Sequence, residues 1–189
     1  MGHRDSLRVD LYTTWPRLNG LLWKVAALTP RLDGASLIVV EAPMGEGKTE
    51  AALLLYETLA ARGATGLYFA LPTQATSNQI LGRVQRFLES AYPGEVHELH
   101  LVHGDAGLSE RYERLKERAF SVRSVDGPAR GEGGAVADAW FSRSKRALLA
   151  PVAVGTVDQA LLGVLGVRHA FLRLHALAGK VVVIDEVHA

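Results

Sequence analysis

Four residues between positions 45 and 49 have the types and spacing of a phosphate-binding loop. In the stretch EAPMGEGKT, Gly45, Gly47, Lys48 and Thr49 fit the end of the pattern G-x-x-x-x-G-K-[ST], with Ala42 where the first glycine is usual. Glycines let successive backbone N–H groups curl around a phosphate, the lysine reaches phosphate oxygens, and the threonine hydroxyl binds Mg²⁺. The expected nucleotide-binding residues are Met44, Gly45, Glu46, Gly47, Lys48, Thr49 and Glu50. The alternative is a tight glycine turn before a helix, with an exposed lysine.

In the last stretch of the sequence, GKVVVIDEVHA, a run of β-branched residues is followed by two adjacent acids, Asp185 and Glu186. A phosphate loop needs a second, acidic site at the end of another parallel strand, to complete the Mg²⁺ shell and to activate water. Asp185 is expected to hold the metal through its water shell, with Thr49, and Glu186 to act as general base on the attacking water. Lys48, Asp185 and Glu186 are therefore the candidate catalytic residues. Acids also follow strands simply to begin a solvated turn, which is the alternative here.

Alternating strands and helices must position these residues. Hydrophobic periodicity predicts helices at about 17–28, 49–62, 73–92, 109–120, 156–166 and 168–177, and strands at 36–40, 66–71, 97–103, 148–155 and 180–186. Residues 121–137 are rich in glycine and charge without periodicity, and we expect a long mobile loop there. Strands that are apolar on both faces and separated by helices predict a parallel sheet covered on both sides, so the fold class is a doubly wound α/β domain.

Composition limits the possible functions. With 189 residues and 48% hydrophobic content, the chain has enough for one well-buried domain. The 21 Lys and Arg residues nearly balance the 20 Asp and Glu residues. Any contact with nucleic acid must therefore depend on local groups of residues, because the net charge of the chain is too small to attract it. The absence of cysteine excludes disulfides and thiolate metal sites. Without an apolar run of about 18 residues, we expect a soluble, cytoplasmic protein and no membrane contact.

The two motifs together resemble superfamily two helicases, with Asp185-Glu186-Val187-His188 as the DExH form of their second motif. Five stretches look like the helicase core of the CRISPR-associated helicase-nuclease of type I interference systems: EAPMGEGKTEAAL, YFALPTQATSNQ, LVHGDAGLSERY, RALLAPVAVGTVDQALLGVL and LAGKVVVIDEVHA. The resemblance runs from about residue 37 to the end, interrupted at 121–137. It implies a P-loop NTPase fold: an extension over 1–35 with one amphipathic helix, and a first RecA-like lobe over 36–189. That lobe would be incomplete at its C-terminus, because the sequence stops just after the DExH motif.

The family implies an ATP-driven translocase that moves 3′ to 5′ on single-stranded DNA, with ATP and Mg²⁺ as cofactors. By resemblance, five residues at two helix starts contact the DNA backbone: Thr73, Gln74, Asn78, Thr156 and Gln159. Hydroxyls, amides and helix-start N–H groups bind phosphate without reading sequence. Thr73 and Thr156 are also good N-caps for their own helices, which is the alternative role. The basic segment 143–146 either adds phosphate contacts or is a solvated turn.

Other parts of the family's architecture are not encoded in these residues. A nuclease metal site would need histidines ahead of the phosphate loop, where there is only His3. His97, His100 and His103 lie on a predicted strand whose period of two turns His100 away from its neighbours, so we interpret them as ordinary strand residues. Asn19 stands where related helicases use a glutamine to recognise adenine, which leaves adenine selectivity open.

We expect this chain to be the first lobe of such a helicase, as a fragment, a truncated product or one half of a split enzyme. Its expected partners are single-stranded DNA, a second RecA-like lobe that carries arginine fingers, and by resemblance the guide-RNA surveillance complex. The alternatives are a stand-alone nucleotide-binding switch or scaffold without turnover, and a P-loop ATPase unrelated to DNA.

Overall fold

The structure is a computed structural model that describes residues 20–28, 30, 32, 34–102, 113–117, 134–136, 146–165 and 169–186. The chain forms two compact units, residues 1–64 and residues 65–189, and each is described by itself. The division falls after Ala64, and the domain boundary expected at residue 35 stays a prediction.

In its described residues, the first unit contains the α-helices α2 (Gly20–Leu28) and α3 (Lys48–Ala60). The α3 sequence KTEAALLLYETLA is rich in alanine and leucine, which are strong helix formers. Leu22 and Val25, three residues apart on α2, pack with Ala51 and Leu54, three residues apart on α3. This shared apolar stripe holds the predicted N-terminal helix against the helix that follows the glycine loop.

The strand predicted at residues 36–40 is not a strand in the structure. These residues have no regular secondary structure, and the side chains of Leu37 and Val39 are 92% and 74% exposed. Only Ile38 packs against the α2–α3 core. A strand exists only where a neighbour accepts and donates its backbone hydrogen bonds, and none of the described strands pairs with this segment. The apolar run was therefore identified correctly, but its pairing was not.

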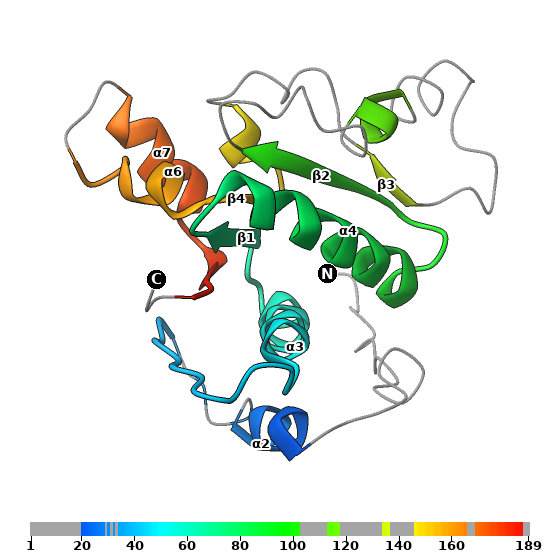
Figure 1. The fold of residues 1–189 in the computed structure, drawn as a ribbon. Coiled ribbons are helices and arrows are strands. Elements are labelled where there is room, and N and C mark those ends of the chain that lie inside the picture. The colour runs from blue at the N-terminus through cyan, green and yellow to red at the C-terminus, as the bar shows by residue number, and fades with distance from the viewer. Residues whose placement is uncertain are drawn as a thin grey trace, which may run out of the picture. The chain divides into compact units, whose positions relative to one another are not determined.

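The second unit contains a parallel sheet with the strand order β3-β2-β4-β1-β5 (Figure 1). The strands are β1 (Gly66–Leu71), β2 (Val96–Val102), β3 (Gly134–Val136), β4 (Val152–Thr156) and β5 (Lys180–Ile184). Phe69 at the centre of β1 pairs with Val154 on one side and Val183 on the other. All six residues of β1 are buried, as expected of a central parallel strand, and β5 lies at one edge of the described sheet.

The short strand β3 corrects the prediction of a loop over residues 121–137. Residues 134–136 run parallel to the start of β2, with Val96 opposite Gly134. Three residues are too few to show an alternating pattern, so only the neighbouring strand reveals them. The remainder of the predicted loop lies outside the described residues.

Helices complete the layers of the second unit. The longest is α4 (Gln74–Ala91), which buries a face with helical spacing that includes Ile80, Val84, Phe87 and Leu88 and lies along β1 to β4. The face of the sheet that carries Tyr68 packs against the short 3₁₀ turn η3 (Ala147–Leu149) and α7 (Ala170–Leu177). The helix predicted at 156–166 is shorter in the structure, where α6 spans Val157–Leu161, and residues 113–117 are helical within the prediction for 109–120.

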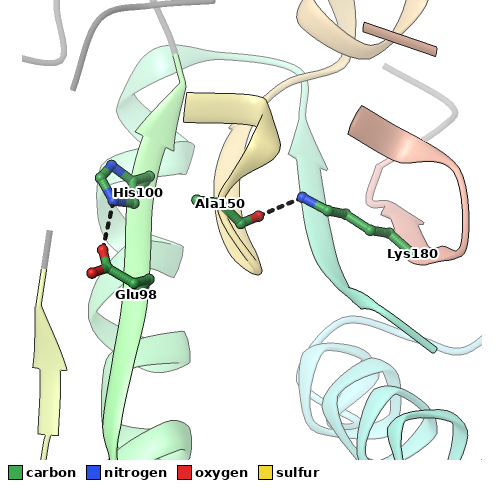
Figure 2. A network of polar contacts seen from close by, with 4 residues as sticks. All are labelled: Glu98, His100, Ala150 and Lys180. Atoms are coloured by element: carbon green, nitrogen blue, oxygen red, sulfur yellow. Dashed lines mark hydrogen bonds and ion pairs between the residues drawn. The ribbon is translucent and has the colours of Figure 1, made fainter. Parts of the chain in front are cut away.

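Two polar side chains, Lys180 and His100, form hydrogen bonds in the interior of this unit (Figure 2). The Lys180 ammonium, at the start of β5, donates to the carbonyl oxygens of Leu148 (2.6 Å) and Ala150, and burial lowers its pKa to about 8. On β2, the fully buried His100 donates from Nε2 to the carboxylate of Glu98 at 3.1 Å. Lys180 thus ties the strand that precedes the acidic pair to the segment that precedes β4.

Candidate functional site

The glycine loop of the first unit begins α3 directly at Lys48. Gly45 and Gly47 have φ angles of 82° and 83°, in the left-handed region that glycine adopts at little cost. Gly47 is the N-cap residue of α3, and its carbonyl accepts the first helical hydrogen bond from the Ala51 N–H at 2.9 Å. The two glycines of the motif therefore stand where the backbone must turn back on itself before the helix starts.

Lys48 folds back across this loop. Its ammonium donates to the carbonyl oxygens of Ala42 (2.7 Å) and Pro43 (3.3 Å), at the other end of the motif. Thr49 is buried, whereas Met44 is 94% exposed and Glu46 is also exposed, as expected for a side chain that faces solvent. A cation held by loop carbonyls beside the N-terminus of a 13-residue helix, where the helix dipole is positive, fits the phosphates of a nucleotide.

Three of the predicted site segments meet at one edge of the sheet in the second unit. Leu71 at the end of β1 pairs with Thr156 at the end of β4, and Ala70 pairs with Ile184 at the end of β5. Because the three strands are adjacent and parallel, the residues that follow them emerge on the same side. The starts of α4 and α6 and the acidic pair are thus brought together at the carboxyl edge, where ligands bind in open α/β sheets.

The acidic pair has a defined local geometry. The Asp185 N–H continues the ladder by donating to the Ala70 carbonyl at 3.0 Å, and Asp185 Oδ1 accepts from the Glu186 N–H, also at 3.0 Å. Asp185 is half-buried and Glu186 is exposed. Glu186 has a φ of 56°, a conformation that is strained for a residue with a side chain. Strain of this kind is concentrated at functional positions, which agrees with the role expected for this residue.

The start of α4 presents polar side chains at the surface. Thr73 caps the helix, because its Oγ1 accepts from the Thr76 N–H at 3.2 Å, so the N-cap role predicted for it is confirmed. The Ser77 hydroxyl donates to the Thr73 carbonyl at 2.9 Å and reinforces the turn. Gln74 and Asn78 are exposed one helical turn apart on the same face. These amides are well placed to bind a ligand that follows the edge of the sheet.

The start of α6 is less accessible. Thr156 is only 8% exposed, and although it occupies the N-cap position its side chain makes no capping hydrogen bond. Gln159 is half-buried, and its side-chain oxygen accepts from Arg173 Nη1 at 3.0 Å. Arg173 was missed by the sequence reasoning, because a contact between residues 14 positions apart on two helices leaves no signal in spacing.

Several other residues singled out in the sequence lie elsewhere. His97 and His100 are on β2, and the His97 ring lies 5.0 Å from that of Tyr92. Within the described ranges, no cluster of three or more His, Asp or Glu side chains is arranged to hold a metal ion. Asn19, His103, His188 and residues 143–145 fall outside the described residues. None of the helices in the described part of the chain is both long and apolar enough to cross a bilayer.

No protein-family model matches the chain. Among curated proteins, it is 54% identical over 184 residues to the CRISPR-associated endonuclease/helicase Cas3 of Thermus thermophilus, which covers 95% of this chain and 19% of that protein. It is 41% identical over 157 residues to the CRISPR-associated nuclease/helicase Cas3 of Streptococcus thermophilus and 35% identical over 155 residues to the Escherichia coli protein. The chain thus spans about a fifth of the length of these relatives.

Solved structures give the same match. The crystal structure of T. fusca Cas3-ATP has a TM-score of 0.76 and 40% identity, over 95% of this chain and 18% of that one. The T. fusca Cas3-AMPPNP structure has a TM-score of 0.77 and 38% identity, over 95% of this chain and 19% of that one. Nearly the whole chain is therefore similar, in both sequence and fold, to one segment of Cas3 proteins, and it has the RecA-like α/β fold of that segment.

Proposed function

We propose that this chain is the ATP-binding and DNA-contacting lobe of an ATP-dependent, single-stranded-DNA translocase of type I CRISPR interference. The observation that carries the proposal is the position of the Lys48 ammonium, held across the glycine loop by the carbonyls of Ala42 and Pro43. The similar curated proteins are Cas3 nuclease-helicases, and the similar crystal structures include T. fusca Cas3-ATP, Cas3-ADP and Cas3-AMPPNP.

Each residue of the nucleotide site has a role that follows from its chemistry. The amides of the loop from Gly45 to Gly47 and the Lys48 ammonium bind phosphate oxygens, because each donates hydrogen bonds and the ammonium adds charge. Thr49 would bind Mg²⁺ through its hydroxyl and Asp185 would hold the ion through its water shell, and the ion when bound would neutralise negative charge on the phosphate oxygens. Glu186 accepts a proton from the attacking water, and its exposed carboxylate is accessible for that exchange.

The proposed DNA site lies at the carboxyl edge of the sheet. The five proposed contact residues are Thr73, Gln74, Asn78, Thr156 and Gln159. The exposed amides at the start of α4 are suited to donate to phosphate oxygens, which carry no information about base sequence. A second RecA-like lobe and the guide-RNA surveillance complex are the proposed protein partners.

Calorimetric titration with Mg-ATP tests the nucleotide site. A charge-assisted hydrogen bond contributes about 1.5–3 kcal/mol, so Lys48→Ala is expected to weaken binding by roughly 10- to 100-fold. Lys24→Ala is the matched control, because Lys24 is an exposed lysine of the same unit on α2. Equal affinity of the Lys48→Ala variant and the unmodified chain would remove Lys48 from the site.

ATP turnover with and without single-stranded DNA, in the presence of a candidate second-lobe chain, tests the wider assignment. Stimulation of turnover by DNA is the result expected of a translocase lobe. Binding of ATP without turnover would instead indicate a nucleotide-binding switch or scaffold, and turnover indifferent to DNA would indicate an ATPase that acts on something else.

A further inference from the structure

Contacts from other elements must hold α6 in place. The helix has only five residues, none of them buried, and its N-cap side chain forms no capping hydrogen bond. A helix of this length has no stability of its own, since nucleation costs more than one turn of hydrogen bonds returns. Its orientation, and with it that of Gln159, therefore depends on its neighbours.

Tyr68 on β1 anchors the residue at which α6 begins. Its hydroxyl donates to the Thr156 carbonyl at 2.9 Å, and its side chain is fully buried. The ring reaches this carbonyl across Gly155, where a Cβ atom would lie 2.5 Å from the Tyr68 oxygen and 2.5 Å from the Val102 carbonyl. Burial raises the pKa of Tyr68, so the phenol remains a protonated donor throughout the physiological range.

Arg173 on α7 holds the middle of α6. Its Nη1 donates both to the backbone carbonyl and to the side-chain Oε1 of Gln159, each at 3.0 Å. The turn that follows α6 approaches α7 closely at Gly163, where a Cβ atom would lie 3.3 Å from Leu174 Cδ2 and 3.4 Å from Arg173 Cβ. One nitrogen of Arg173 thus fixes both the backbone and the side chain of the same residue.

This contact also determines which end of the Gln159 amide remains for a ligand. A guanidinium carries only donors, so it must face the amide oxygen, and the NH₂ group becomes the end not engaged by Arg173. Phosphate oxygens are acceptors only, and an NH₂ group is therefore the end of a carboxamide that they can bind.

We propose that Arg173 is a positioning residue that orients the Gln159 carboxamide so that its NH₂ group donates to a phosphate of single-stranded DNA, with Tyr68 as the second anchor of α6. The proposal rests on the function proposed above. It adds a residue without direct contact to the ligand, whose effect on DNA affinity passes through Gln159.

A double-mutant cycle measures this dependence. The binding of a fluorescent oligo(dT) by this chain, followed by anisotropy, is compared for the unmodified chain and for Arg173→Met, Gln159→Ala and the double variant. We expect Arg173→Met to weaken binding about five- to tenfold, which corresponds to about 1–1.4 kcal/mol, and to have no further effect once Gln159 is replaced. Arg173→Lys, which keeps a donor, should recover part of the affinity.

Hydrogen exchange in the absence of DNA tests whether Arg173 and Tyr68 hold α6 in place. The amides of α6 should exchange faster in Arg173→Met and in Tyr68→Phe, which removes only the hydroxyl, while the amides of β1 and β4 keep their protection. Loss of protection across the whole sheet in Arg173→Met would show unfolding, and Arg173→Lys then supplies the affinity comparison.

The outcomes separate this inference from the proposed function. If Gln74→Ala and Gln159→Ala both leave DNA affinity unchanged, the proposed DNA site is wrong. If those variants weaken binding but Arg173→Met costs as much in the Gln159→Ala background as alone, or costs nothing, the positioning role is overturned.

Discussion

Replacement of Glu57 by glutamine is expected to stabilise the protein at alkaline pH. Glu57 lies on α3 and is 6% exposed, and within the described part of the chain neither carboxylate oxygen has a hydrogen-bond partner. It shares a face of the helix with Thr49 and Leu53, which precede it at four-residue intervals. Burial without a partner penalises the charged form and raises the pKa of Glu57 from 4.5 to about 7.

The sign of the pH dependence follows from proton binding. The unfolded chain releases this proton near pH 4.5 and the folded chain near pH 7, so the folded state binds more protons in that window. The free energy of unfolding therefore falls as the pH rises from 4.5 to 7, and the full cost applies above pH 7. At about 1.4 kcal/mol for each pH unit, the cost approaches roughly 3 kcal/mol. Glutamine keeps the shape of the side chain and never ionises, so it should avoid most of this cost.

Urea denaturation of the unmodified chain and of Glu57→Gln at pH 5 and pH 8 tests the reasoning. We expect the two free energies of unfolding to differ by less than about 1 kcal/mol at pH 5, and the variant to be more stable by roughly 2–3 kcal/mol at pH 8. Glu41→Gln, an exposed glutamate of the same unit, serves as control and should change neither value. A Glu57→Gln variant that is less stable at pH 8 would mean that the carboxylate has a cationic partner, and would refute the argument.

Three further changes have defined outcomes. Gly66→Ala should lower the free energy of unfolding by about 2 kcal/mol or more in denaturant titration, because the new Cβ would overlap the Pro151 carbonyl, whereas Gly20→Ala, with nothing near its Cβ, should not. The unmodified chain should gain stability between pH 8 and 10.5, because burial lowers the pKa of Lys180 from 10.5 to about 8 and only the unfolded state stays protonated there; Lys180→Met should lose this gain. By family resemblance an arginine finger comes from a second lobe and is worth about 10³–10⁵ in rate, so residues 1–189 alone should bind ATP with negligible single-turnover hydrolysis. Robust turnover that Glu186→Gln abolishes would contradict that expectation.

Local pattern predicted most of the secondary structure. The apolar run expected at 66–71 is β1 with those bounds, and the helices expected at 49–62 and 73–92 are α3 and α4 within two residues at each end. The spacing of apolar residues within such a segment indicates which face of the helix or strand is apolar. This face can be predicted from the sequence because it depends only on residues that are consecutive in the chain. The same pattern at 36–40 did not produce a strand, because an apolar run does not specify the neighbour that completes its hydrogen bonds.

Some features of the candidate site could likewise be predicted from the sequence, and others could not. The motif predicted the glycine loop, and the structure adds that Gly45 and Gly47 take left-handed conformations and that Lys48 reaches back to Ala42. The capping role of Thr73 also followed from sequence, because its partner is three residues away. Contacts that close within a few residues are encoded locally, so residue type and spacing are enough to predict them.

Other features depend on which segments the fold brings together. The strand order places the ends of β4, β1 and β5 side by side, and the Tyr68 hydroxyl meets a carbonyl 88 positions along the chain. The bond from Arg173 to Gln159 likewise depends on how two helices pack, and the burial of Glu57 is a property of the folded structure. The sequence determined which residues can do chemistry and which faces are apolar. The tertiary structure alone decided which of those residues meet, because burial and long-range hydrogen bonds are set by the neighbours that packing supplies, not by spacing along the chain.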